Sequence, residues 1–83
     1  MSNLMVIFTY EGNPLTMQCK SDDVVDNVFQ KYCQKAKLNI EDVKFYYNSS
    51  QVFQCGKTLA ALGVKNLFGF NVVREKYVNG AAN

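Results

Sequence analysis

Three consecutive residues, Gly56, Lys57 and Thr58, have the types and order in which a phosphate-binding loop ends. Such a loop has the form G-x-x-x-x-G-K-[ST], because its first glycine lets the backbone N–H groups turn toward the phosphates. That glycine would stand at position 51, where the sequence has Gln51. The loop must also lead into a long helix, whereas the apolar segment here ends at Gly63 after little more than one turn. The sequence therefore disfavours nucleotide binding.

The other residues that could carry chemistry do not form a catalytic or metal-binding set. The chain has no histidine, and its cysteines lack the C-x-x-C spacing of zinc or redox sites: Cys19, Cys33 and Cys55. We interpret all three as reduced thiols in or near the core of a cytoplasmic protein. Asp22 and Asp23 precede an apolar run, which is typical of helix caps and not of a general acid and base. We expect a protein that is not an enzyme and that has no cofactor and no metal.

Length and composition indicate one small globular domain. The chain has 83 residues, of which 48% are hydrophobic, so it has the means to bury a single core. Its net charge is only +2, and the basic residues are spread from Lys20 to Lys76, whereas binding to phosphate backbones needs clustered cations. No apolar run approaches the length of a membrane span. We therefore expect no nucleic-acid and no membrane partner.

The first part of the chain predicts a hairpin followed by a helix. "LMVIFTY" is rich in β-branched and aromatic residues, which is typical of a strand, and "LTMQCK" alternates apolar with polar residues. The turn residues of "EGNP" separate the two segments. A helix is expected to begin near Val24, with Asp23 and Asp26 acting as a capping box at its N-terminus. Its apolar side follows the i, i+3, i+4, i+7 rule: Val25, Val28, Phe29, Tyr32 and Ala36.

The second part predicts two more strands, a helical turn and a final strand. "VKFYYN" alternates with Val43, Phe45 and Tyr47 on one face, and "QVF" is expected to be a short strand. "GKTLAALGV" is expected to place Leu59, Leu62 and Val64 on the core, and "LFGFNVV" closes the sheet. Residues 1–74 would form the domain, and residues 75–83 a flexible tail. The predicted buried set is Val6, Phe8, Leu15, Met17, Val25, Phe29, Phe45, Leu59, Phe68 and Phe70.

This order of elements describes a β-grasp domain, and from about Met5 to Arg74 the chain resembles ubiquitin and its relatives. The segments that carry the resemblance are "VIFTYEG", "SDDVVDNV", "FYYNSSQV" and "GKTLAALGV", the last being similar to the family's "GRTLSDYNI". The resemblance implies an α+β fold in which a mixed sheet of four or five strands packs on one helix. It also offers another explanation for Gly56-Lys57-Thr58: Thr58 and Leu59 start a turn beneath the sheet, while Lys57 faces solvent.

The resemblance further implies a role in protein–protein interaction. Conjugated members need a flexible end with Gly-Gly, whereas "EKYVNGAAN" has the single glycine Gly80, so we expect a divergent, non-conjugating domain that binds non-covalently. Partners of such domains usually dock on the exposed face of the sheet. Mapped by position, that face would carry Lys44, Tyr46, Asn48, Gly69 and Asn71, an aromatic and polar set in place of ubiquitin's aliphatic patch.

Within that set, Tyr46 is the candidate anchor, since tyrosine offers apolar area and a hydroxyl at low entropy cost. It could instead simply pack against its neighbours in "FYY". We expect a protein partner and a monomeric domain. Three alternatives stay open: a conjugated modifier, a scaffold of the Ras-association or PB1 type that pairs through charge, and a structural subunit.

Overall fold

The computed structural model describes residues 3–75 and starts with the hairpin that the alternating pattern predicts. Strand β1 (Asn3–Tyr10) pairs antiparallel with β2 (Asn13–Lys20). The two residues between them, Glu11 and Gly12, have φ values of 51° and 80°. Two successive positive φ values are typical of a type I′ turn, whose twist matches that of the flanking strands. Gly12 adopts this conformation without the steric cost that a side chain would bring.

The rest of the sheet forms around β5 (Phe68–Arg74), which lies between β1 and β3 (Val43–Tyr47). The short strand β4 (Ser50–Val52) pairs with β3 at the far edge. The order is β2-β1-β5-β3-β4, with β1 parallel to β5 and the other pairs antiparallel. The predicted mixed sheet is therefore confirmed, with five strands.

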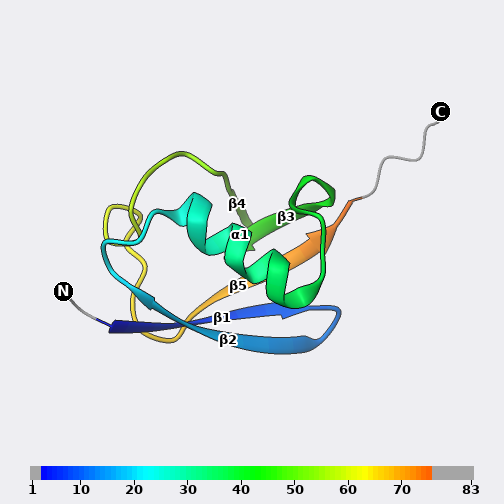
Figure 1. Cartoon of the computed structure of the whole chain (residues 1–83), viewed down its shortest axis with the longest axis horizontal. Coiled ribbons are helices and arrows are strands. Elements are labelled where there is room, and N and C mark those ends of the chain that lie inside the picture. The colour runs from blue at the N-terminus through cyan, green and yellow to red at the C-terminus, as the bar shows by residue number, and fades with distance from the viewer. Residues whose placement is uncertain (1–2, 76–83) are drawn as a thin grey trace.

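Helix α1 (Val25–Ala36) lies across one face of this sheet (Figure 1). It begins at Val25, close to the predicted start, and ends at Ala36, after which the left-handed backbone of Lys37 (φ 59°) caps the last turn. A single 3₁₀ turn (Ile40–Asp42) then leads into β3.

The predicted capping box at the start of α1 is wrong. The Asp23 carboxylate does not cap the helix but accepts a hydrogen bond from the Lys20 N–H at 2.9 Å, closing the turn after β2. The Asp26 carboxylate accepts one from the Gly56 N–H, also at 2.9 Å. The two acids therefore bind backbone donors outside the helix.

The first turn of α1 is instead completed by the loop that follows β4. The Val25 N–H donates to the Lys57 carbonyl at 2.9 Å, and the Leu59 N–H donates to the Asp23 carbonyl at 2.9 Å. The Thr58 hydroxyl accepts from the amide three residues later, which starts the predicted turn. Figure 1 shows this loop passing the N-terminal end of α1. Gly56-Lys57-Thr58 thus completes a helix start, and Lys57 is exposed as expected.

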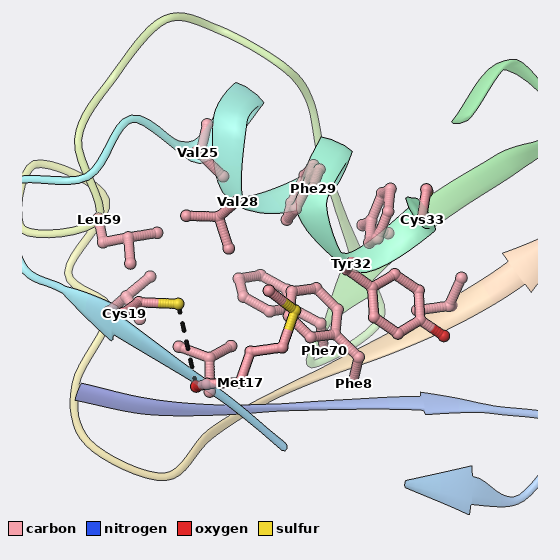
Figure 2. Packing of buried hydrophobic residues seen from close by; sticks show 14 of the residues in the cluster. Phe8, Met17, Cys19, Val25, Val28, Phe29, Tyr32, Cys33, Leu59 and Phe70 are labelled. Atoms are coloured by element: carbon pink, nitrogen blue, oxygen red, sulfur yellow. Dashed lines mark hydrogen bonds between the residues drawn. The ribbon is translucent and has the colours of Figure 1, made fainter. Parts of the chain in front are cut away.

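The core between α1 and the sheet is built largely from stacked aromatic rings (Figure 2). Phe8 stacks on Tyr32 with ring centroids 4.4 Å apart, and Phe29 stacks on Phe45 at 3.8 Å. Phe70 lies 5.4 Å from Phe8 and completes the group. Such pairs contribute about 0.5–1.5 kcal/mol each beyond their buried area, so this cluster fixes the helix on the sheet.

Two residues of the predicted buried set are only half-buried, Leu15 and Phe68. Leu15 lies on the edge strand β2, where α1 covers the sheet incompletely. Phe68 is the first residue of β5 and stacks on Tyr47 at 3.9 Å. Tyr47 is on the expected face but 36% exposed, because it stands at the last residue of β3. The other eight predicted residues are buried.

The three cysteines are free, as predicted, but they do not share one environment. Cys19 and Cys33 are buried in the core, whereas Cys55 is exposed, so its predicted place in or near the core is wrong. The reason is that the loop carrying Cys55 contacts α1 through its backbone, at Gly56 and Lys57, and leaves its side chains in solvent.

Across residues 3–75, no helix is both long enough and apolar enough to cross a bilayer.

Candidate functional site

The face of the sheet that is turned away from α1 carries four of the five predicted site residues. Lys44 and Tyr46 alternate with buried residues on β3, and Gly69 and Asn71 alternate with buried residues on β5. Tyr46 lies directly opposite Asn71 in the antiparallel register of these strands. We call the surface around this pair the outer face, defined by Lys44, Tyr46, Gly69, Asn71 and Val73.

The fifth predicted residue, Asn48, lies beyond the strand, so its predicted place on the sheet face is wrong. Asn48 and Ser49 form the two-residue turn between β3 and β4, with φ values of 50° and 67°. This is again the type I′ geometry, which asparagine tolerates better than most residues. Both residues are exposed at the tip of the hairpin, at the margin of the outer face.

Val73 belongs to the outer face although the sequence analysis did not include it. Its side chain is 42% exposed, and it lies opposite Lys44 in the register of β5 and β3. The signal that could have found it is the two-residue period of β5, because Gly69, Asn71 and Val73 fall on the same side. The face is therefore not only aromatic and polar, since it also offers one aliphatic side chain.

Gly69 leaves part of the outer face open. It lies beside the half-buried Ile7 of β1, and a Cβ added at Gly69 would meet no other atom within 4 Å. Its φ lies outside the left-handed region, so a larger side chain could be placed there without backbone strain. We therefore expect that a larger residue in place of Gly69 would block access to the outer face without disturbing the fold.

An open hollow of about 410 Å³ lies on this face, and it joins apolar to polar groups. The residues that line it are Tyr46, Ser49, Asn71, Val73 and Glu75. They supply an aromatic ring, an aliphatic side chain, a hydroxyl, an amide and a carboxylate. The hollow can therefore receive a side chain that has both an apolar stem and a polar end.

Glu75, which lines the hollow, forms an ion pair with Lys44. The Lys44 Nζ lies 2.6 Å from the Glu75 Oε1, and the two side chains are 44% and 47% exposed. The Glu75 N–H also donates to the Asp42 carbonyl at 2.8 Å. Glu75, the first residue of the expected tail, is thus held against the domain, while residues 76–83 lie outside the described part of the chain.

No group of residues in the described range 3–75 has the donors needed to hold a metal ion. The side chains of the outer face can stack, donate and accept hydrogen bonds, and pair with charge.

Comparisons with known proteins identify the fold. No protein-family model and no curated protein sequence matches the chain. Among solved structures, a ubiquitin of Caldiarchaeum subterraneum matches with a TM-score of 0.81 at 20% identity, covering 94% of this chain and 100% of that one. A ubiquitin-like domain of an Arabidopsis thaliana protein matches with a TM-score of 0.82 at 14% identity, covering 100% of this chain and 87% of that one.

A third match is ATBAG1, solved in complex with HSP70, with a TM-score of 0.77 at 12% identity. The match covers 87% of this chain and 40% of that one. The mixed sheet, the single helix across it and these matches define a ubiquitin-like β-grasp fold. At these identities the likeness establishes the fold alone.

Proposed function

We propose that this chain is a non-covalent protein–protein interaction module, which binds its protein partner through the outer face as a monomeric, non-enzymatic domain of the cytoplasm. The observation that carries the proposal is the position of Tyr46 and Val73 beside one hollow, with Asn71, Ser49 and Glu75 around them. An apolar centre with a polar rim is the usual anatomy of a protein-binding surface. Binding energy at such surfaces concentrates in a few anchors, among which tyrosine is enriched.

The shape of the site favours a protein over a small molecule. Small-molecule sites enclose most of their ligand's surface, whereas this hollow is open on an exposed strand face. Support for a protein partner also comes from a structural neighbour, since ATBAG1 has been solved in complex with HSP70. A protein of which part resembles this chain has thus been solved in complex with another protein.

The anchor can be tested with single variants of the outer face. The first step is to immobilise the chain and to identify the proteins that it retains from a lysate, alongside its Tyr46→Ala and Lys31→Ala variants. Lys31→Ala is the matched control, because Lys31 lies on the exposed side of α1. A partner retained by the unmodified chain and by Lys31→Ala would then be titrated into the labelled chain. We expect Tyr46→Ala to weaken binding by about 1–2 kcal/mol. The backbone amide spectrum of the variant should remain that of a folded protein.

Two outcomes would contradict the proposal. One is a cluster of amide shifts on α1 and at its C-terminal cap, at Lys31, Lys35 and Lys37. Such shifts would place the partner on the helix and not on the outer face. A thioester formed on incubation with an activating enzyme and ATP would show covalent attachment through the C-terminal segment. As a steric check, Gly69→Gln should weaken binding without unfolding, because its added side chain would project over the outer face.

A further inference from the structure

We propose that the hollow on the outer face binds an arginine side chain of the partner, and that Lys44 competes with this arginine for the Glu75 carboxylate in the free domain. The inference rests on the proposed function, because it assumes that the outer face is where a protein docks. It adds the chemistry of the partner's contacting residue, which the fold does not specify.

The lining of the hollow offers a cation a carboxylate, an aromatic ring and hydrogen-bond acceptors. Among the described residues that line it, Glu75 is a carboxylate and none is a cation. The Tyr46 ring offers a face over which a cation can lie, and the Asn71 amide and the Ser49 hydroxyl offer oxygen acceptors. Val73 supplies apolar area for the methylene stem of a long basic side chain. Carboxylate, aromatic ring and acceptors thus surround one volume.

Arginine fits these groups better than lysine does. Its planar guanidinium can donate two parallel hydrogen bonds to a carboxylate and can stack on an aromatic ring. A lysine ammonium is a compact, strongly hydrated point charge, which has neither the two-pronged donor geometry nor a planar surface that stacks on a ring. With Glu75 and Tyr46 lining the same hollow, the site combines the two contacts that distinguish a guanidinium from an ammonium.

The Lys44–Glu75 ion pair shows that the carboxylate already attracts a cation. Lys44 Nζ lies 2.6 Å from Oε1 of Glu75. Both side chains are nearly half exposed, and ion pairs of this kind add little to stability, so exchange for another cation is easy. Glu75 itself is positioned by its backbone hydrogen bond to Asp42. The backbone of Glu75 therefore stays in place when the cation is exchanged, so its carboxylate remains within reach of the hollow.

A small arginine probe tests the inference without knowledge of the partner. The ¹⁵N-labelled chain would be titrated with N-acetyl-arginine amide and, separately, with the citrulline analogue, which keeps the shape but not the charge. A ligand of this size should bind in the millimolar range. We expect saturable amide shifts at Tyr46, Asn71, Val73 and Glu75 with arginine and not with citrulline.

Three variants separate this site from general attraction between charges. Glu75→Gln should weaken binding of the arginine probe about fivefold, the effect of roughly 1 kcal/mol. Lys44→Met should strengthen it, because the internal competitor is removed. Lys35→Met removes the same charge from the exposed side of α1 and should leave the affinity unchanged.

The inference is overturned if citrulline binds as well as arginine, if the shifts lie away from the hollow, or if Lys44→Met and Lys35→Met have the same effect. Its failure can be told apart from failure of the proposed function. If Tyr46→Ala weakens binding of the protein partner while Glu75→Gln and the arginine probe have no effect, the outer face binds a protein but not through a cation. If Tyr46→Ala also has no effect on the partner, both conclusions fail.

Discussion

The three thiols of the chain differ in burial, so we expect them to differ in reactivity. Cys19 and Cys33 are 5% and 3% exposed, whereas Cys55 lies in an exposed loop. Burial also raises the pKa of the Cys19 and Cys33 thiols, so the reactive thiolate is scarcer at both. We expect iodoacetamide at pH 8 to modify the native chain once, at Cys55, and the urea-unfolded chain three times, as counted by intact mass.

The Cys55→Ala variant is the control for that experiment, since its native form should remain unmodified over the same period. Rapid modification of native Cys33 would show that α1 opens far more readily than its packing allows.

The outer face was largely predictable because strand alternation is a local property. Once Phe45 and Phe70 are assigned to the core, Lys44, Tyr46 and Asn71 must point the other way. The ion pair between Lys44 and Glu75 was not predictable, because it requires the chain to continue alongside β3 for one residue beyond the end of β5. By the same argument, the two-residue period of β5 should have led us to include Val73 among the predicted residues of this face.

At the scale of elements, the start of α1 depends on a contact between segments far apart in the chain. Asp26 accepts the Gly56 N–H across 30 positions, and Val25 donates to the carbonyl of Lys57. Capping rules consider only residues a few positions apart in sequence. They therefore predicted that Asp23 and Asp26 cap the backbone N–H groups of the helix. The segments were therefore identified correctly, whereas their mutual hydrogen bonds required the tertiary structure.

Removing the Asp26 carboxylate should loosen both the helix start and the loop that follows β4. We expect Asp26→Ala to lower the free energy of unfolding by about 1 kcal/mol, the usual contribution of one hydrogen bond, measured by urea denaturation. Asp22→Ala is the matched control, because Asp22 is exposed, and it should change the free energy by less than about 0.5 kcal/mol. Equal effects of the two substitutions would mean that the contact between Asp26 and Gly56 does not stabilise the fold.

At the scale of the whole molecule, one largely aromatic core joins the helix to four of the strands, and its composition leads us to expect a fold that is sensitive to alkali. Phe8, Met17, Phe45 and Phe70 come from different strands and meet α1 at Tyr32 and its neighbours. This core was predictable as a set of apolar positions, because periodicity identifies the buried side of each element. The presence of three ionisable groups within it gives the protein a pH dependence that the apolar pattern alone does not suggest.

Burial raises the pKa of Tyr32 as well as that of Cys19 and Cys33, and the negative charge of Asp23 adds to the effect at Cys19. All three groups are neutral when protonated, so the folded state holds their protons more tightly than the unfolded state does. Their contribution to stability is complete below the ordinary thiol pKa of about 8.5 and is lost as the pH rises through the raised pKa values of the folded state.

We expect the free energy of unfolding to be flat from about pH 7 to 8, to fall above about pH 8.5, and to fall further once the ordinary tyrosine pKa of about 10 is passed. Urea denaturation across this range measures the slope. Cys33→Ala should make the fall shallower, whereas Cys55→Ala, at the exposed position, should leave the slope unchanged; a slope insensitive to Cys33→Ala would show that this thiol is not protonated preferentially in the folded core.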